Sequence, residues 1–133
     1  ELYYFNESFS NVGVLGTEIS DTATEFINTI QWDFHELKEE WVGQFDIVYT
    51  NSWDHSYNLD KALDSWMKSL SPNGRLFLDW NEDTLEPTNK ADCCGCTFEE
   101  LQEVLNKKYI VEDTFKIENQ HNKEAHMVVV KNK

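Results

Sequence analysis

The fold is decided by residues Phe45–Trp80, FDIVYTNSWDHSYNLDKALDSWMKSLSPNGRLFLDW, within a chain of 133 residues. Two short apolar runs, Ile47–Tyr49 and Leu76–Leu78, are bounded by polar residues, which is typical of strands covered on both faces. Apolar residues at helical spacing lie between them and predict a helix with one apolar face; they are Leu59, Ala62, Leu63, Trp66, Met67 and Leu70. This order predicts a right-handed βαβ unit with two parallel strands.

Two polar segments connect the helix of this unit to its strands. Pro72–Gly74 stops the helix and turns the chain into the second strand. Thr50–Ser56 follows the first strand directly. Because ligands of open parallel sheets bind at the carboxyl ends of the strands, we expect a ligand beside Thr50–Ser56.

The stretch resembles the second half of class I S-adenosylmethionine-dependent methyltransferases. The resemblance rests on Asp46 opening the first strand, on the small polar residues after it, and on the turn Leu70–Leu76 (LSPNGRL), which is similar to the family's L-x-P-G-G-x-L. Asn73 stands where glycine is usual, a mild change because Asn tolerates a left-handed backbone. The resemblance covers about Val12 to Val130 and implies one α/β domain: a Rossmann-like, mostly parallel sheet with flanking helices and a C-terminal antiparallel hairpin.

The composition of the chain indicates which partners are not expected and which compartment is favoured. A net charge of −14 repels phosphate backbones, so we expect no nucleic-acid partner. No apolar run approaches the roughly 20 residues of a membrane span, so no membrane partner is expected. The three cysteines, Cys93, Cys94 and Cys96, are odd in number and clustered, which is unlike a secreted disulfide framework and favours a cytoplasmic location.

The segment Val12–Ser20 is predicted to be a buried strand that ends in an acid, Glu18. A carboxylate in this position can accept hydrogen bonds from both ribose hydroxyls of a nucleoside, and the resemblance assigns that role to Glu18, with its neighbour Ile19 also against the cofactor. Alternatively, Glu18 caps the helix expected to start near Ser20. The core face of that helix would consist of Ala23, Phe26, Ile27 and Ile30.

A second short strand, Ile30–Phe34, also carries an acid near its end. The resemblance implies that Asp33 accepts a hydrogen bond from the adenine amino group and that Phe34 packs on the adenine ring. The alternative is that Asp33 is a helix cap or a solvated loop acid.

The loop after the central strand holds the catalytic candidates. The resemblance places Asn51 and Ser52 against the methionine portion of the cofactor, where an amide side chain can hydrogen-bond. Asp54 and His55 could orient or deprotonate an acceptor hydroxyl, amine or acid, because His titrates near neutrality. Alternatively, Asp54 hydrogen-bonds its own loop and His55 is structural.

The polar run Asn81–Lys90 is long enough to be a lid over an acceptor pocket. It leads into the cysteine cluster, where Cys93 and Cys96 form one C-x-x-C. No second pair completes a structural zinc site, so thiols in a turn are favoured over a metal site with His121 or His126 as distant ligands.

The C-terminal part predicts a helix and closing strands. Thr97–Glu100 is a capping box, followed by an apolar face; its members are Phe98, Leu101, Val104 and Leu105. Three apolar runs then predict strands: Tyr109–Val111, Phe115–Ile117 and His126–Val130. A polar bend, Glu118–Glu124, joins the last two as a hairpin.

The family's glycine-rich loop between its first strand and helix is missing, since Glu1–Asn11 contains no glycine. Nor can Leu2–Phe5 be a parallel neighbour of the strand that opens at Val12, because a parallel crossover needs about a dozen residues. The first strand is therefore expected to be absent. Either the chain is N-terminally truncated, or it is a reduced domain that closes the gap by rearrangement or by pairing with a second copy as a homo-oligomer.

These observations predict S-adenosylmethionine-dependent methyl transfer to a small-molecule acceptor. A catalytically inactive methyltransferase-like binding or assembly module, or an inactive fragment, is the alternative that the missing loop favours. A nicotinamide-dependent enzyme on a similar fold fits the acid at Glu18, but the chain has no G-x-G-x-x-G.

Overall fold

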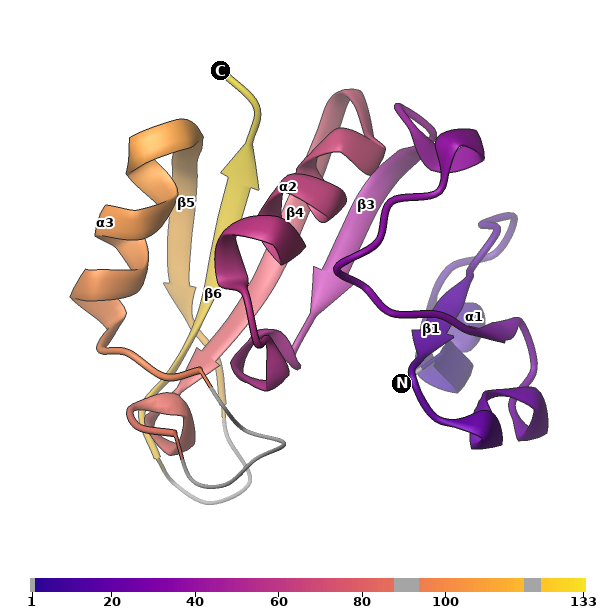
Figure 1. The fold of residues 1–133 in the computed structure, drawn as a ribbon, viewed down its shortest axis with the longest axis horizontal. Helices are drawn as coiled ribbons and strands as arrows, with labels where there is room; N and C mark the ends of the chain where they lie inside the picture. The colour runs from indigo at the N-terminus through magenta and orange to yellow at the C-terminus, as the bar shows by residue number, and fades with distance from the viewer. Residues whose placement is uncertain (1, 88–93, 119–122) are drawn as a thin grey trace. The chain divides into compact units, whose positions relative to one another are not determined.

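The computed structural model describes residues 2–87, 94–118 and 123–133 (Figure 1). The chain divides into two compact units, Glu1–Glu36 and Leu37–Lys133, and each is described by itself. The sequence-based interpretation of the chain as one domain stays a prediction.

The first unit contains a helix, two short strands and a 3₁₀ turn. They are α1 (Leu2–Ser8), β1 (Gly16–Glu18), η1 (Asp21–Glu25) and β2 (Thr29–Gln31). The two strands pair in parallel, with Glu18 opposite Gln31. The prediction that Glu18 ends a strand with a parallel neighbour is therefore confirmed.

Two other predictions for this unit are wrong. The strand expected over Val12–Ser20 is only three residues long and is not buried, and Val12 is 53% exposed. The helix expected after Ser20 is a single 3₁₀ turn, in which only Ala23 is buried. The left-handed backbone of Asn28 (φ 55°) ends any continuous helix before Ile30.

The apolar residues of that expected helix are on the surface. Phe26 and Ile27 are 58% and 81% exposed, because no second layer within the unit covers them. The strand predicted at Ile30–Phe34 lies earlier, at Thr29–Gln31, so Asp33 and Phe34 come after its end.

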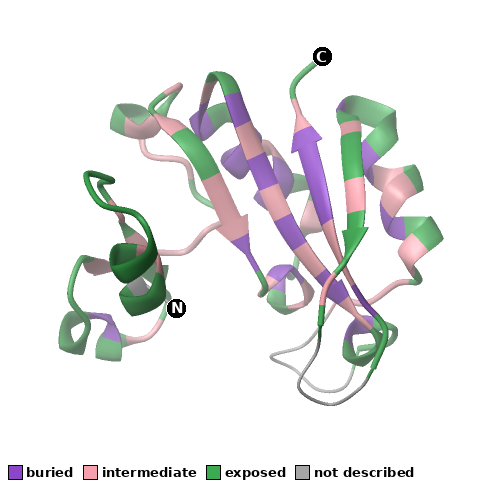
Figure 2. Cartoon of the chain, turned by 180° about the vertical axis from the view of Figure 1, so that it is seen from behind, coloured by how far each residue is buried: buried purple, intermediate pink, exposed green. Residues whose placement is uncertain are grey.

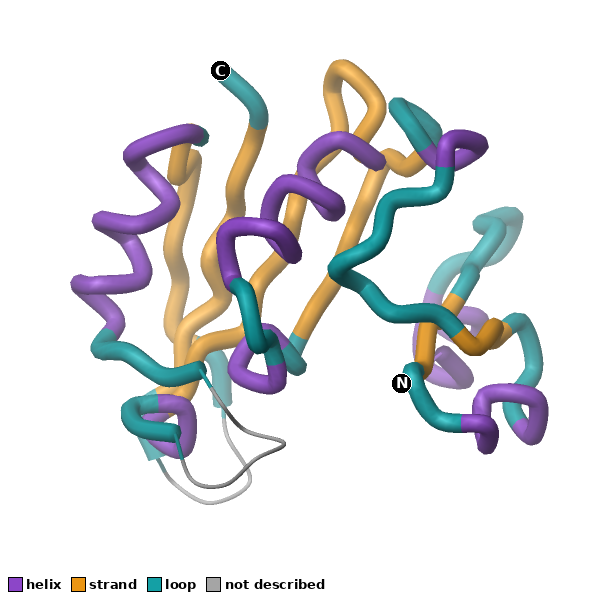
Figure 3. Tube along the Cα trace, in the orientation of Figure 1, coloured by secondary structure: helices purple, strands orange, loops and turns teal. Residues whose placement is uncertain are grey.

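The second unit is built on a four-stranded sheet in the order β3-β4-β6-β5 (Figure 3). The strands are β3 (Phe45–Thr50), β4 (Leu70–Asn81), β5 (Ile110–Lys116) and β6 (Ala125–Lys131). β3 and β4 pair in parallel across α2 (Leu59–Ser69), which confirms the βαβ unit. β5 and β6 pair antiparallel and β6 pairs antiparallel with β4, which confirms the α/β class with a closing antiparallel hairpin.

One C-terminal prediction needs correction. Tyr109–Val111 and Phe115–Ile117 were expected to be separate strands, but Ile110–Lys116 is one strand with a register shift between Val111 and Asp113. The polar residues between the two apolar runs therefore lie within the strand, because an extra residue in one strand displaces the pairing without ending it.

Two capped helices cover one face of the sheet, as the front and back views show (Figures 1 and 2). The side chain of Asn58 caps α2, and Thr97 and Glu100 form the predicted capping box of α3 (Phe98–Lys108). The residues between the helices and the sheet form the core; those that are almost fully buried include Leu63, Met67, Leu76, Leu78, Leu101, Leu105, Val128 and Val130.

Burial alternates along β4, so the prediction that the central strands are covered on both faces is wrong. Leu76, Leu78 and Trp80 are buried under the helices, whereas Phe77 and Asp79 on the other face are only partly buried. In β3, Ile47 is 57% exposed. A strand with one covered face shows this two-residue period.

Gly74 is required inside β4, where the pairing of β4 with β3 shifts register. A Cβ on Gly74 would lie 2.7 Å from the carbonyl oxygen of Phe45, closer than non-bonded atoms approach. Asn73 does not use the left-handed region, since within the described residues only Asn11, Asn28 and Gly43 have a positive φ. The glycine usual at Asn73 is therefore not needed for this turn.

Candidate functional site

The loop at the carboxyl end of β3 is fixed from beneath by a tryptophan. Trp53 opens η3 (Trp53–His55) and is fully buried, and its indole Nε1 donates a hydrogen bond of 2.8 Å to the carbonyl oxygen of Asp79 in β4. The backbone N–H of Ser52 donates to the hydroxyl of Thr50 at 3.2 Å. The loop is thus held to the sheet while its polar side chains remain at the strand end.

Asp54 and His55 are brought together in this loop. Their nearest atoms, Asp54 Oδ1 and His55 Nε2, are 4.0 Å apart, and the side chains are 16% and 51% exposed. The backbone N–H of Cys94 donates a 2.8 Å hydrogen bond to the carbonyl oxygen of Asp54. A half-exposed imidazole beside a fixed carboxylate can take up a proton from an acceptor and be stabilised once charged.

Asn51 and Ser52 lie at the start of the same loop. The hydroxyl of Ser52 donates to Asn51 Oδ1 at 3.0 Å, and Asn51 is exposed. The bond holds the amide oxygen toward Ser52, so the amide NH₂ is the group of Asn51 suited to meet an anion.

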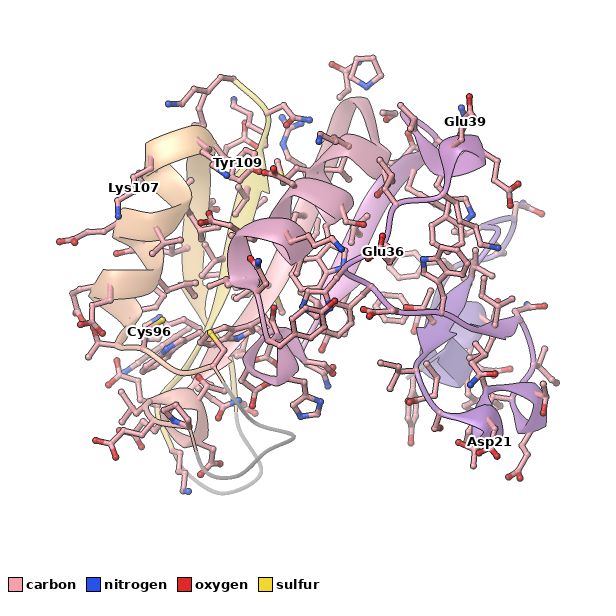
Figure 4. All side chains as sticks on the ribbon, viewed as in Figure 1. Asp21, Glu36, Glu39, Cys96, Lys107 and Tyr109 are labelled. Carbon is pink, nitrogen blue, oxygen red and sulfur yellow. The ribbon has the colours of Figure 1, made fainter. Side chains whose placement is uncertain are left out.

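The segment that precedes α3 is tied to the same end of the sheet, where Cys96 lies (Figure 4). The backbone N–H of Cys96 donates to the carbonyl oxygen of Thr84 at 3.0 Å, and Trp80 Nε1 donates to the carbonyl oxygen of Cys96 at 3.0 Å. Burial foremost, and then the charge of Cys94, raise the pKa of the Cys96 thiol to about 11. This thiol stays protonated at neutral pH and is poorly suited to nucleophilic or metal chemistry.

A metal site finds no support in the part of the chain that the structure describes, where no group of three or more candidate ligands could hold an ion. Cys93 and His121 lie outside the described residues, as does the end of the expected lid, residues 88–90. The lid stays a prediction. No described helix is long and apolar enough to cross a bilayer.

An aromatic cluster at this end of the sheet was not identified from the sequence. The ring of His126 stacks on Phe98 at 4.3 Å, and Trp80 lies 5.4 Å from Phe98. The hydrogen bond between His126 Nε2 and Glu124, 2.8 Å long, lowers the pKa of that carboxyl. The pairing of β6 with β4 places His126 opposite Trp80, and no local sequence pattern indicates this contact.

In the first unit, Glu18 makes a local bond. Its Oε1 accepts a 3.0 Å hydrogen bond from the backbone N–H of Ser20, the residue that precedes η1, and no side chain caps η1 itself. The side chain is exposed, and a carboxylate can accept about four hydrogen bonds, so this bond leaves capacity for a ligand. Ile19 is 65% exposed.

Asp33 forms hydrogen bonds with His35, a buried histidine that was not identified from the sequence. Asp33 Oδ1 accepts from the backbone N–H of His35 at 2.9 Å and pairs with His35 Nδ1 at 2.7 Å. His35 is 3% exposed, and its ring lies 4.6 Å from that of Phe34. The spacing Asp-x-His, typical of an Asx turn, was the available signal.

The candidate residues therefore fall into two groups of four. Glu18, Ile19, Asp33 and Phe34 belong to the first unit, and Asn51, Ser52, Asp54 and His55 belong to the second. In the first group, Glu18 ends β1 and the other three residues follow β1 or β2; in the second group, all four residues follow β3.

Comparison with known proteins identifies the fold. No family model and no curated protein sequence matches the chain. The PH0226 protein of Pyrococcus horikoshii OT3 is similar in structure, with a TM-score of 0.72 and 14% identity over 99% of this chain and 76% of its own. The Burkholderia thailandensis 1,6-didemethyltoxoflavin-N1-methyltransferase, solved with 1,6-didemethyltoxoflavin and S-adenosylhomocysteine, has a TM-score of 0.74 and 17% identity over 98% of this chain and 65% of its own.

A TehB-like SAM-dependent methyltransferase from Corynebacterium glutamicum gives a TM-score of 0.63 at 18% identity, with 90% of this chain and 67% of that chain covered. The chain thus spans between about two thirds and three quarters of these three proteins. It has the class I methyltransferase fold predicted from its sequence.

Proposed function

We propose that the chain binds S-adenosylmethionine and takes part in methyl transfer to a small-molecule acceptor. The fold supports this proposal, as does the B. thailandensis neighbour, a methyltransferase whose structure holds 1,6-didemethyltoxoflavin and S-adenosylhomocysteine. The observation that carries it is the loop Asn51–His55, a polar segment anchored by buried Trp53 at the carboxyl end of a parallel strand.

The first unit supplies the residues proposed for the nucleoside. Glu18 is exposed at the end of β1 and has acceptor capacity for ribose hydroxyls beyond its bond to Ser20. Ile19 and Phe34 offer apolar surface for the adenine ring. Asp33 has Oδ1 committed to His35, so its proposed contact with the adenine amino group would use the remaining acceptor sites of its carboxylate.

The second unit supplies the residues proposed for the methionine end and the acceptor. Asn51 and Ser52 can hydrogen-bond the amino-acid end through amide and hydroxyl groups. When bound, S-adenosylmethionine supplies a methyl group on a sulfonium, which leaves as a neutral thioether. His55 takes the proton that the acceptor heteroatom loses as it forms its bond to carbon, and Asp54 stabilises the resulting imidazolium.

Calorimetric titration with S-adenosylhomocysteine and S-adenosylmethionine tests the proposal, with thermal shift as a second readout. At about 100 times the dissociation constant, ligand binding stabilises the folded chain by about 2.7 kcal/mol, which is readily visible. We expect Glu18→Ala to weaken binding at least about tenfold, since two hydrogen bonds to ribose are lost. Glu25→Ala, which removes another exposed acid of the same unit, is the matched control and should leave affinity unchanged.

A second candidate function is a methyltransferase-like module that binds or assembles without catalysis. The local hydrogen bonds of Glu18 and Asp33 favour it, because they occupy part of the carboxylates proposed to hold the cofactor. No binding of either cofactor form by the intact wild-type chain would reject methyl transfer and leave this alternative. Binding followed by transfer of a radiolabelled methyl group to any acceptor would reject the module.

A further inference from the structure

Two cysteine thiols lie in the short segment that precedes α3, where Figure 4 labels Cys96, and the proposed methyl transfer uses neither of them. Both Cys94 and Cys96 are partly exposed, and neither is part of a disulfide. Their positions in the sequence are two apart, so their Cα atoms are at most about 7 Å apart. A disulfide needs a Cα separation of about 4.4–6.8 Å, so little movement of the chain is needed to join the two sulfur atoms.

The backbone of this segment is fixed to the fold on both sides of its glycine. The N–H of Cys94 donates a 2.8 Å hydrogen bond to the carbonyl oxygen of Asp54. The N–H of Cys96 donates a 3.0 Å hydrogen bond to the carbonyl oxygen of Thr84. A Cβ on Gly95 would lie 2.7 Å from a backbone carbon of a neighbouring segment, so only glycine fits between the two cysteines. The fold therefore keeps the two cysteines near each other before any bond joins them.

The two thiols differ in reactivity. Burial foremost, and then the charge of Cys94, raise the pKa of the Cys96 thiol to about 11. Cys96 is therefore protonated at neutral pH, and because the thiolate is the reactive form of cysteine, Cys94 is the residue that attacks an oxidant first. Once the sulfur of Cys94 is in a disulfide it carries no charge, which removes one of the causes that raise the pKa of Cys96.

We propose that Cys94 and Cys96 form a redox modification site, at which a small disulfide such as oxidised glutathione converts the two thiols into one disulfide. The Cys94 thiolate attacks one sulfur of oxidised glutathione, and a glutathione thiolate leaves. Cys96 then loses its proton and attacks the Cys94 sulfur of the mixed disulfide, and the second glutathione thiolate leaves. Two cysteine thiols are oxidised, one glutathione disulfide is reduced to two thiols, and both protons end on the glutathione sulfurs.

Geometry also bears on which cysteines pair. Adjacent cysteines are a poor pair, because the Cα atoms of neighbouring residues are only about 3.8 Å apart, below the separation that a disulfide needs. Cys93 lies outside the described residues, so a bond between Cys93 and Cys96 is the competing outcome that the experiment must separate. Since Cys94 and Cys96 are partly exposed, small thiols can reach the bond that joins them, and the modification is reversible.

Alkylation after equilibration with glutathione tests the proposal. The wild-type chain is equilibrated at several ratios of oxidised to reduced glutathione, trapped with N-ethylmaleimide, digested and analysed by mass spectrometry. The reduced chain takes up three alkyl groups, one on each of its three cysteines. We expect the oxidised chain to take up one alkyl group, on Cys93, with Cys94 joined to Cys96. Dithiothreitol should then restore both thiols.

Cys93→Ser is the matched control, because it removes one cysteine and keeps the proposed pair. Its disulfide should form at the wild-type glutathione ratio to within about threefold. Alkylation of all three wild-type cysteines at every ratio overturns the proposal. A wild-type disulfide that contains Cys93 or joins two chains, a glutathione adduct that stays on Cys94, or a well-folded Cys93→Ser variant that forms no bond overturns it as well. No cofactor is present in these measurements, so their outcome is independent of the proposed methyl transfer.

Discussion

Residues 37–133 and 1–36 use apolar side chains in opposite ways. In the second unit two helices and a sheet enclose large residues such as Leu78 and Leu101, which are fully buried. In the first unit the described residues that are buried are Ala23 and His35. Its large apolar residues are largely on the surface; those exposed are Tyr3, Tyr4, Phe9, Val12, Leu15, Ile19, Phe26 and Ile27. Apolar side chains form a core only where a second layer of helices or strands packs on the first.

The units also differ in charge. Residues 1–36 contain seven of the 25 acidic residues and none of the 11 Lys and Arg residues. In the second unit many cations are paired with acids, as Arg75 and Lys131 are with Glu112 and Lys123 is with Asp83. The first unit includes the pair between Asp33 and His35. Because it contains no lysine or arginine, it has fewer cations of its own to balance its acids, and it also has fewer buried residues.

The largest effect that this contrast predicts comes from truncating one apolar side chain in each unit. Leu78→Ala leaves a cavity in the second unit and should lower the free energy of unfolding by about 2–5 kcal/mol. Ile27→Ala removes a side chain that is 81% exposed and should change it by less than about 0.5 kcal/mol. Urea unfolding followed by circular dichroism measures both. Equal effects would show that the first unit buries Ile27 in solution.

A smaller difference is expected for the two tryptophan anchors. Trp53→Phe leaves the carbonyl oxygen of Asp79 without its indole donor in a buried site and should cost about 1–3 kcal/mol. Trp32→Phe removes the 2.5 Å bond from Trp32 Nε1 to the carbonyl oxygen of Glu36, in a more exposed place, and should cost about 0.5 kcal/mol. The same urea titration compares them, and a larger cost for Trp32→Phe would contradict the order.

The sequence predicted the second unit well because its patterns reflect packing. The helical stripe from Ala62 to Met67 is buried as expected, and the capping box at Thr97 forms. The apolar pattern of a strand does not show whether a second layer covers each face of the sheet. The expected burial of the strands on both faces was therefore wrong.

The first unit was predicted poorly because its apolar residues have no second layer that buries them. Periodic apolar residues at Phe26, Ile27 and Ile30 suggested a helix, but periodicity stabilises a helix only when its apolar face is buried. Hydrogen bonds of short polar side chains, such as Ser20 with Thr22, and the left-handed Asn28 set the local backbone instead. The roles of Glu18 and Asp33 toward a cofactor stay predictions, and their local bonds could be foreseen only as alternatives.

The negative charge of the chain leads to a prediction about its affinity for the two forms of the cofactor, which rests on the proposed function. S-adenosylmethionine carries one more positive charge than S-adenosylhomocysteine, and a chain of net charge −14 attracts it more strongly. We expect the preference for the charged form to fall about fivefold between low and physiological salt, as screening grows. Calorimetry at several salt concentrations measures the ratio of the two dissociation constants. The variant Asp21→Asn should weaken this salt dependence, and a ratio constant in salt would refute the idea.

The smallest effect concerns acid stability. Hydrogen bonds from Arg75 foremost, and from Lys131 at 2.6 Å, lower the pKa of Glu112 from 4.5 to about 2. Because the folded-state pKa lies below the unfolded one, this contribution is complete above about pH 4.5 and is lost as pH falls through about 2. Glu112→Gln should therefore flatten the decline of unfolding free energy in this window. Glu25→Gln, in the unit without lysine or arginine, should leave the decline unchanged. Equal slopes for wild type and Glu112→Gln would mean that solvent screens the three-strand ion pair completely.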